Sequence, residues 1–313
     1  ARAQFGVYED PTLTDYLTRT GNTLTPHTHR PHLNYHFAVL DSPVINAFAT
    51  PGGYIYFTRG ILSLMNSEAE MAVILGHELG HVNARHSAKK LSQLYLVQIG
   101  LAVGSELSEK FAEISGVASI GIQLLFLKFS RDDEREADTL GVEYSRKGRY
   151  NPAAVIDFFD SLQALRDLSG GQSLPGFLST HPVTSERIGN TNGMITEADN
   201  QLLSKSEAFL DRVDNLVYGD DPRQGYVEGS TFYHPLMRFY FSIPQGWKLQ
   251  NTPTQVVLAS EDGNAAIILQ AEKNSENLRN YAQKKVETIE GRDFISDQSL
   301  TINGMSAYQQ VLD

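Results

Sequence analysis

The chain has 313 residues, of which 41% are hydrophobic and 20% are charged, an ordinary globular composition that argues against wholesale disorder. Its formal net charge of −11 argues against nucleic-acid binding, because that function needs a basic surface to neutralise phosphates. The sequence has no cysteine, which excludes disulfides, thiolate zinc sites and cysteine nucleophiles together.

The amino terminus and the hydropathy pattern bear on where the protein works. Ala1-Arg2-Ala3 has the A-x-A form of a signal-peptidase site, which predicts a periplasmic or otherwise exported protein, although a trimmed sequence would explain it equally well. No stretch reaches the roughly 18 uninterrupted apolar residues that a membrane span requires. Residues 91–127 come closest and are interpreted as two buried helices, the alternative being a flap that touches a membrane. We therefore expect no integral span, and peripheral contact with a membrane or membrane proteins stays open.

The first two thirds of the chain are expected to be mainly helical, with one short antiparallel sheet. Ser67 and Glu70 form a capping box, which predicts the start of a helix that carries apolar residues at helical spacing. Strands are predicted at residues 33–40, 44–49 and 54–58. Further helices are predicted at residues 10–25, 91–128, 129–147, 152–168 and 197–217.

A Gly/Asp/Pro-rich stretch, residues 219–230, is interpreted as a linker between two domains. Residues 1–218 would form the first domain, and residues 231–313 a smaller α+β domain with several strands and one helix at about 275–290. Because the chain stops in a strand-like run, this smaller domain is expected to be truncated. The predicted fold class is α+β, and the smaller domain is a candidate for binding a partner.

The stretch GHELGHVNARHSAKK, residues 76–90, carries the main chemical signal. His77 and His81 are four residues apart on a predicted helix, so both imidazoles project from one face and can reach a single tetrahedral zinc ion. Glu78 lies about 100° around the helix. There it can take a proton from metal-bound water and pass it to a leaving amine. This is the spacing of an H-E-x-x-H zinc peptidase motif.

A third histidine, His86, follows in the same stretch. It is nine residues beyond His77, which puts it about 180° around the axis while the helix continues. A metzincin site would need Gly at position 84 and His at position 87, where the sequence has Ala84 and Ser87. His86 is therefore interpreted as a solvated residue at the end of the helix, outside the metal site.

A zinc peptidase needs a third protein ligand, usually His, Glu or Asp, and leaves the fourth position to water. The segment FSRDDEREADTLG places Glu134 and Asp138 four residues apart, so both face the same way on a helix. We expect Glu134 to bind the metal and Asp138 to accept a hydrogen bond from a ligand histidine. Glu136 lies on the opposite face, solvated or paired with an arginine. Without the upstream motif, a charged helix surface would be the simpler interpretation.

With HELGH upstream, the pattern S-R-x-x-E-x-x-A-D from Ser130 to Asp138 resembles family forty-eight of the metallopeptidases. These are gluzincin zinc endopeptidases, and the family includes HtpX, the CaaX prenyl protease, the Oma-type proteases and periplasmic BepA. Residues 46–60 resemble the family's strand-turn-strand, and residues 180–188 resemble its HP…R segment. The resemblance covers residues 30–190, approximately, and is closest to the exported branch. It weakens after residue 220, where BepA-type proteins have helical repeats and this chain has strands.

The resemblance implies a zinc-dependent endopeptidase with one Zn²⁺ per chain. Zinc would be held by His77, His81 and Glu134, with Glu78 as the general base and acid. The substrate would be a protein or peptide, in a setting such as envelope quality control. An extended substrate is expected to pair with an edge strand. That strand would contain Asn46, Ala47, Phe48 and Ala49.

The resemblance implies roles for two further residues. His181 would stabilise the oxyanion or take the fourth zinc position and hold the enzyme shut; capping of the following helix is the third interpretation. Arg187 would pair with developing negative charge or with a neighbouring carboxylate. A competing hypothesis is a latent or chaperone-like binding factor whose zinc site is occluded by His181 or by residues 91–127.

Overall fold

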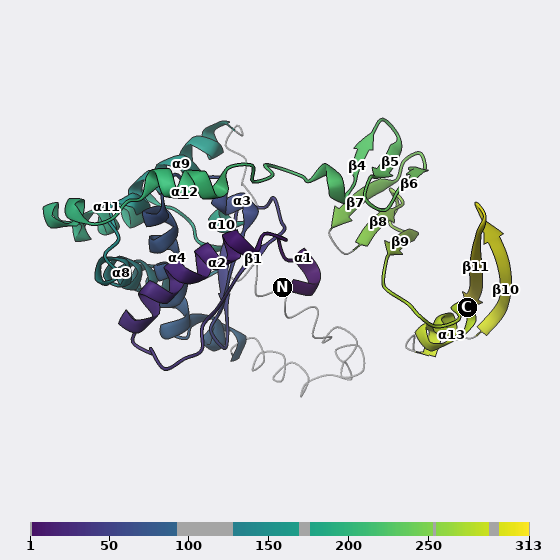
Figure 1. The fold of residues 1–313 in the computed structure, drawn as a ribbon, viewed down its shortest axis with the longest axis horizontal. Helices are drawn as coiled ribbons and strands as arrows, with labels where there is room; N and C mark the ends of the chain where they lie inside the picture. Colours follow the sequence, from purple (N-terminus) through teal and green to yellow (C-terminus); the bar gives the residue numbers. More distant parts are fainter. Residues whose placement is uncertain (1, 93–127, 169–175, 253–254, 288–293, 313) are drawn as a thin grey trace. The chain divides into compact units, whose positions relative to one another are not determined.

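The computed structural model describes residues 2–92, 128–168, 176–252, 255–287 and 294–312 (Figure 1). The predicted α+β class is confirmed, and the chain divides into two compact units, Ala1–Ile267 and Ile268–Asp313. Residues 219–230 lie within the first unit, and they contain the 3-10 helix Pro222–Gln224 and strand β4 (Tyr226–Glu228). The domain limits drawn from the sequence stay a prediction.

The first unit is helical over most of its length. Its described helices are α1 (Arg2–Phe5), α2 (Pro11–Leu24), α3 (Arg59–Leu62), α4 (Glu68–Asn83), α8 (Arg131–Lys147), α9 (Ala154–Leu168), α10 (Phe177–Thr180), α11 (Ser185–Met194) and α12 (Ser206–Val213). Helices α2, α8 and α9 confirm three of the predicted helices. The helix predicted at 197–217 is wrong, because Lys205 adopts a left-handed conformation between the 3-10 helix Glu197–Gln201 and α12. The predicted helices within 93–127 lie outside the described residues.

The three predicted amino-terminal strands are present, but their pairing differs from the prediction. Strands β1 (His36–Leu40), β2 (Ala47–Thr50) and β3 (Tyr54–Thr58) form a sheet in the order β1-β3-β2. Strands β2 and β3 are antiparallel, whereas β1 and β3 are parallel. Strand β3 lies between β1 and β2, so β1 and β2 do not pair with each other. With one parallel and one antiparallel pair, the sheet is mixed. This order leaves β2 at an edge.

Helix α4 runs through the core and carries the H-E-x-x-H motif near its carboxyl end. Ser67 caps it by accepting a hydrogen bond from the Glu70 N–H at 3.1 Å, and the Glu70 carboxylate accepts from the Asn66 N–H at 3.1 Å. Every residue from Glu68 to His81 is buried. Helices α2 and α9, and the sheet formed by β1, β2 and β3, contribute to the same hydrophobic core as α4.

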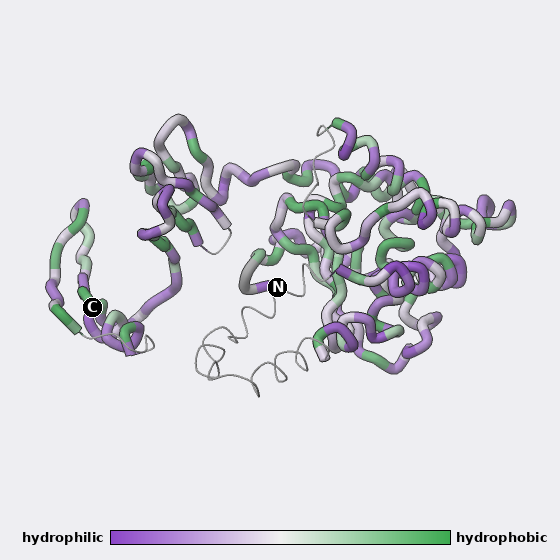
Figure 2. The backbone as a smooth tube through the Cα atoms, turned by 180° about the vertical axis from the view of Figure 1, so that it is seen from behind, coloured by the Kyte–Doolittle hydropathy of each residue, from purple (hydrophilic) through white to green (hydrophobic). Residues whose placement is uncertain are grey.

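Helices α4 and α8 approach each other very closely, and glycines permit it. A Cβ on Gly76 would lie 2.9 Å from the carbonyl oxygen of Gly141, and a Cβ on Gly141 would lie 3.0 Å from the His77 nitrogen. At Gly80 a Cβ would meet the Ala137 backbone at 3.1 Å. Helix α8 is otherwise mostly hydrophilic (Figure 2) and turns only one stripe toward α4. That stripe includes Glu134, which is thereby brought to the histidines.

The remaining strands form small sheets. One sheet of the first unit contains β4 (Tyr226–Glu228), β5 (Thr231–His234) and β6 (Phe239–Ser242). Another sheet contains β7 (Lys248–Thr252), β8 (Gln255–Ala259) and β9 (Ala266–Gln270), and the last residues of β9 belong to the second unit. Phe232, Val256 and Leu258 form a core there. The second unit has α13 (Leu278–Glu287) and the hairpin β10 (Phe294–Ile302) and β11 (Met305–Leu312). Among the described helices, none has both the length and the apolar character needed to cross a membrane.

Candidate metal centre

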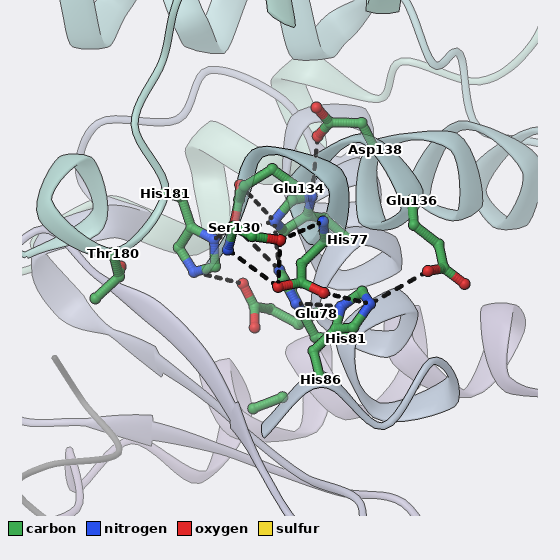
Figure 3. Close-up of polar contacts among 12 residues, drawn as sticks. His77, Glu78, His81, His86, Ser130, Glu134, Glu136, Asp138, Thr180 and His181 are labelled. Atoms are coloured by element: carbon green, nitrogen blue, oxygen red, sulfur yellow. Dashed lines mark hydrogen bonds and ion pairs between the residues drawn. The ribbon is translucent and has the colours of Figure 1, made fainter. Parts of the chain in front are cut away.

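Four buried side chains with metal-ligand chemistry meet at one point: His77, His81, Glu134 and His181 (Figure 3). The Nε2 atoms of His77 and His81 are 3.1 Å apart, and His181 Nδ1 lies 3.3 Å from His77 Nε2. Glu134 brings Oε1 to 3.5 Å from His81 Nε2 and Oε2 to 3.6 Å from His77 Nε2. His181 Nδ1 also lies 2.8 Å from Glu134 Oε1.

These distances fit a bound metal ion. Zinc bonds of about 2.0–2.1 Å in a tetrahedral arrangement hold ligand atoms about 3.3 Å apart, close to the separations between these four groups. The donors are imidazole nitrogens and a carboxylate oxygen, which suit zinc. Glu134 is not without a partner, since its Oε2 lies 2.7 Å from Arg187 Nη1. The fit to a metal therefore depends on the spacing of the four groups and on their ligand chemistry.

His181 reaches the cluster from a separate element, at the carboxyl end of α10. The Phe177 N–H donates to the Ile45 carbonyl at 2.7 Å, which fixes α10 beside the start of β2. Gly176 precedes α10 with φ +110°, and a Cβ there would lie 2.3 Å from the Ile45 oxygen. Only glycine fits this conformation and this contact. The His181 N–H then donates to the Phe177 carbonyl at 2.7 Å, so the imidazole is directed to the two histidines of α4.

Asp138 and Arg187 form a second layer around the cluster. Asp138 Oδ1 lies 3.0 Å from His77 Nδ1, so His77 can donate there and keep the Nε2 lone pair for a metal. Arg187, 5% exposed, contacts Asp138 through Nε at 2.6 Å and Nη2 at 2.7 Å, and Glu134 through Nη1 at 2.7 Å. Of the two partners expected for Arg187, the structure therefore contains the neighbouring carboxylates.

The electrostatics of the site favour charged carboxylates and an uncharged ligand histidine. Burial opposes the charge on Asp138, but the Arg187 guanidinium and His77 outweigh it and lower the pKa of Asp138 to about 2. Burial also opposes the charge on Glu134, yet His181 and Arg187 lower its pKa. Burial, followed by the neighbouring histidines, lowers the pKa of His81 well below its ordinary value. A neutral imidazole has the free lone pair that a metal needs.

Glu78 lies beside the cluster and is also buried. Its Oε1 is 3.6 Å from His181 Nε2 and makes no hydrogen bond within the described residues. Burial raises the pKa of Glu78, only partly offset by the nearby histidines. A carboxylate in this environment is a stronger base than an exposed one, which suits proton transfer. Burial would lower the pKa of His181, but Glu134 and Glu78 outweigh it and raise that pKa.

The interpretation of His86 as a solvated bystander is wrong. It is 2% exposed, and its Nδ1 lies 2.9 Å from His81 Nδ1. An angle of 180° from His77 requires a continuing helix, but α4 ends at Asn83 and Arg85 has φ 62°, so the chain turns and brings His86 back under His81. The left-handed position after the helix holds Arg85 instead of the usual glycine or asparagine, so the sequence carries no signal of this turn. Glu136, expected to be solvated or paired with an arginine, contacts His86 Nε2 at 3.3 Å.

The predicted edge strand presents only part of its backbone to an incoming chain. The Asn46 N–H and carbonyl both contact Thr58, so they face β3. Because backbone direction alternates along a strand, Phe48 faces β3 as well, while Ala47 and Ala49 face outward. The Ala49 carbonyl already accepts from the Ser87 hydroxyl at 3.2 Å. The outward groups left in the described residues are those of Ala47 and the Ala49 N–H.

The chain matches known proteins over the region that contains this site. Residues 11–195, more than half of the chain, match peptidase family M48. The chain belongs to this family. The matched region contains α4, α8 and His181, and the membership confirms the resemblance carried by HELGH and the glutamate segment.

Curated relatives in the family come from bacteria and from eukaryotes. The beta-barrel assembly-enhancing protease of Yersinia pestis is 28% identical over 219 residues, 67% of this chain and 44% of the relative. The mitochondrial metalloendopeptidase OMA1 of Arabidopsis thaliana is 31% identical over 160 residues, 51% of this chain and 31% of the relative. The mitochondrial metalloendopeptidase OMA1 of Schizosaccharomyces pombe is 32% identical over 169 residues, 53% of this chain and 48% of the relative. The chain thus spans less than half the length of these relatives.

Replacing Arg187 by Met should destabilise the metal-free protein by about 3–5 kcal/mol, because the change leaves two buried carboxylates without their counter-cation. Zinc should restore part of this loss, since it would supply positive charge to Glu134. The measurement is urea unfolding with and without zinc. Arg135, 50% exposed and paired with Asp132, is the control, and Arg135→Met should cost about 0–1 kcal/mol. Equal free energies of unfolding for the two variants would contradict this account of Arg187.

Proposed function

We propose that this M48 chain is a zinc endopeptidase that hydrolyses peptide bonds of protein substrates. The observation that carries the proposal is the convergence of His77, His81 and Glu134 at tetrahedral ligand spacing beside a buried Glu78. Family membership supports metallopeptidase chemistry independently of this geometry. The three residues are proposed as ligands of one Zn²⁺ per chain.

In the proposed reaction, a zinc ion held by His77, His81 and Glu134 would supply Lewis-acid chemistry that activates the scissile carbonyl and a water molecule. Glu78 accepts the proton as this water attacks the carbonyl carbon, and the same proton goes to the leaving nitrogen as the C–N bond breaks. Its raised pKa makes it a stronger base for the first of these transfers. Asp138 fixes the tautomer of His77, and Arg187 holds Asp138 in place.

The substrate is proposed to bind as an extended strand along the free edge of β2. Main-chain hydrogen bonds to Ala47 and to the Ala49 N–H would hold it, which gives affinity with little dependence on side chains. The backbone groups of Asn46 and Phe48 pair with β3 and hold β2 in place. They would make no backbone hydrogen bond to the substrate. Such binding suits a protease that acts on many unfolded or misassembled proteins.

The setting is proposed from the relatives. Several of them are called beta-barrel assembly-enhancing proteases, which makes envelope quality control in the periplasm the favoured setting for this chain. Residues 231–313 are proposed to bind a partner, and peripheral contact with membrane proteins is compatible with that role.

Glu78→Gln should keep zinc affinity unchanged and lower the turnover of casein or a generic peptide by about 10²–10⁴-fold, because the amide cannot accept the proton. The control is Glu70→Gln, the same change at another buried glutamate of α4, where the cap contacts can be kept. This control should retain cleavage. Undiminished proteolysis by the Glu78 variant would overturn the mechanism.

A second candidate function is a latent protease or binding factor whose metal site is closed by His181. It is favoured by one observation: His181 Nδ1 lies among the proposed ligand atoms, 3.3 Å from His77 Nε2 and 2.8 Å from Glu134 Oε1. An imidazole in the fourth position would exclude the water that must attack the substrate. Occlusion by residues 91–127 stays a prediction, because most of that segment lies outside the described residues.

If the site is latent, His181→Ala should bind zinc more weakly and cleave a generic peptide severalfold faster than the unmodified chain, because a ligand is lost and a water position is gained. Zinc titration and peptide turnover measure the two effects. Adding Glu78→Gln to this variant should abolish the gain. Slower cleavage with unchanged zinc affinity would contradict latency and assign His181 to oxyanion stabilisation.

A further inference from the structure

The two histidines of the H-E-x-x-H motif have different partners behind them. His77 Nδ1 faces the carboxylate of Asp138 at 3.0 Å. His81 has no carboxylate at Nδ1 within the described residues; that nitrogen faces the Nδ1 of His86 at 2.9 Å instead. Figure 3 shows His86 on the far side of His81 from Glu134. The second layer behind His81 is therefore another imidazole.

A contact between two imidazole nitrogens permits one arrangement of hydrogens if His81 faces a metal with Nε2. His81 must then be protonated at Nδ1 and donate from it, so His86 Nδ1 must accept. The hydrogen of neutral His86 then lies on Nε2. That nitrogen is 3.3 Å from both Asp133 Oδ1 and Glu136 Oε2, which are acceptors. The neighbouring groups thus fix the position of the ring hydrogen on both His86 and His81.

The surroundings of His86 hold this arrangement in place. Asp133 Oδ2 is engaged by the backbone N–H and hydroxyl of Ser130, at 3.0 and 2.7 Å, in the capping box of α8. Only Oδ1 is therefore left to face His86. The Phe129 ring stacks on His81 with centroids 4.1 Å apart, which restrains rotation of that imidazole. A buried histidine serving only to fill space would not need an acceptor pointed at a ligand and a donor pointed at two carboxylates.

We propose that His86 is a positioning residue of the metal site, which accepts a hydrogen bond from His81 Nδ1 and so keeps the His81 Nε2 lone pair available to zinc. This inference rests on the proposed zinc function. Outer partners of metal-binding histidines orient the ring and raise its basicity, and their loss weakens metal binding by about 10–100-fold. His86 does this for His81, as Asp138 does for His77, with Asp133 and Glu136 one step further out.

Two substitutions separate this role from simple packing. Asparagine places its amide oxygen where His86 has Nδ1, so His86→Asn keeps the acceptor for His81. Glutamine places its amide near the position of Nε2, so His86→Gln keeps a donor for Asp133 and Glu136 but lacks that acceptor. We expect His86→Gln to weaken zinc binding by about 10–100-fold, and His86→Asn to bind nearly as tightly as the unmodified chain.

The measurement is the zinc dissociation constant by competition with a chelating dye, with urea unfolding of the metal-free variants as the control for folding. Equal affinity of His86→Gln and the unmodified chain would overturn the proposal, and so would equal weakening in both variants. If the unmodified chain binds no zinc, the proposed function itself fails, which is a different outcome.

A second measurement needs no variant. Nitrogen-15 NMR of the zinc-loaded chain should find the ring hydrogen of His81 on Nδ1 and that of His86 on Nε2, in the neutral form of both rings. A ring hydrogen on Nδ1 of His86 would leave His81 without an acceptor and would overturn the proposal even if His86→Gln failed to fold.

Discussion

The close approach of α4 and α8 is the constraint on which the site depends. Gly76 and Gly141 allow the two backbones to touch where a Cβ would come within about 3 Å of the neighbouring helix. This contact places Glu134, which belongs to α8, within 3.6 Å of both motif histidines. A wider helix spacing would leave the H-E-x-x-H motif with two of its three proposed ligands.

The charge in the site explains why a cation belongs there. Glu78, Glu134 and Asp138 are all buried, and Arg187 is the buried guanidinium that contacts two of them. With all three carboxylates ionised and the histidines neutral, this set has an excess of two negative charges. A divalent ion would balance it, whereas without one the raised pKa of Glu78 relieves part of the repulsion by favouring its neutral form. The same residues thus support both metal binding and a base of suitable strength.

The parts of the site that follow from helical periodicity could be predicted from the sequence. The spacing of His77 and His81 on one helix, and of Glu134 and Asp138 on another, predicts which side chains share a face, and both pairs do meet at the site. No local pattern encodes that these two helices are neighbours; Glu134 is expected at the site because a zinc peptidase needs a third ligand, and the family resemblance supports it. His181 could be connected to the site only through the resemblance, because α10 is positioned by a backbone contact to Ile45.

The errors arose where local backbone geometry departs from the regular repeat. His86 was misplaced because the left-handed residue Arg85 ends the helical register that the angular argument assumed. Lys205 interrupts a predicted helix in the same way. In the sheet, alternation identifies the strands, yet nothing in it distinguishes a parallel from an antiparallel neighbour, so the expectation of a wholly antiparallel sheet is wrong for β1 and β3.

The central claim is that His77, His81 and Glu134 together hold one zinc ion. Diffraction from the zinc-loaded chain at the zinc absorption edge tests it most directly, because the anomalous signal locates the metal independently of the protein atoms. The account predicts a single strong peak about 2.0–2.2 Å from both Nε2 atoms and a Glu134 carboxylate oxygen. A peak at another site, or a metal bound by the two histidines with Glu134 out of reach, would contradict it.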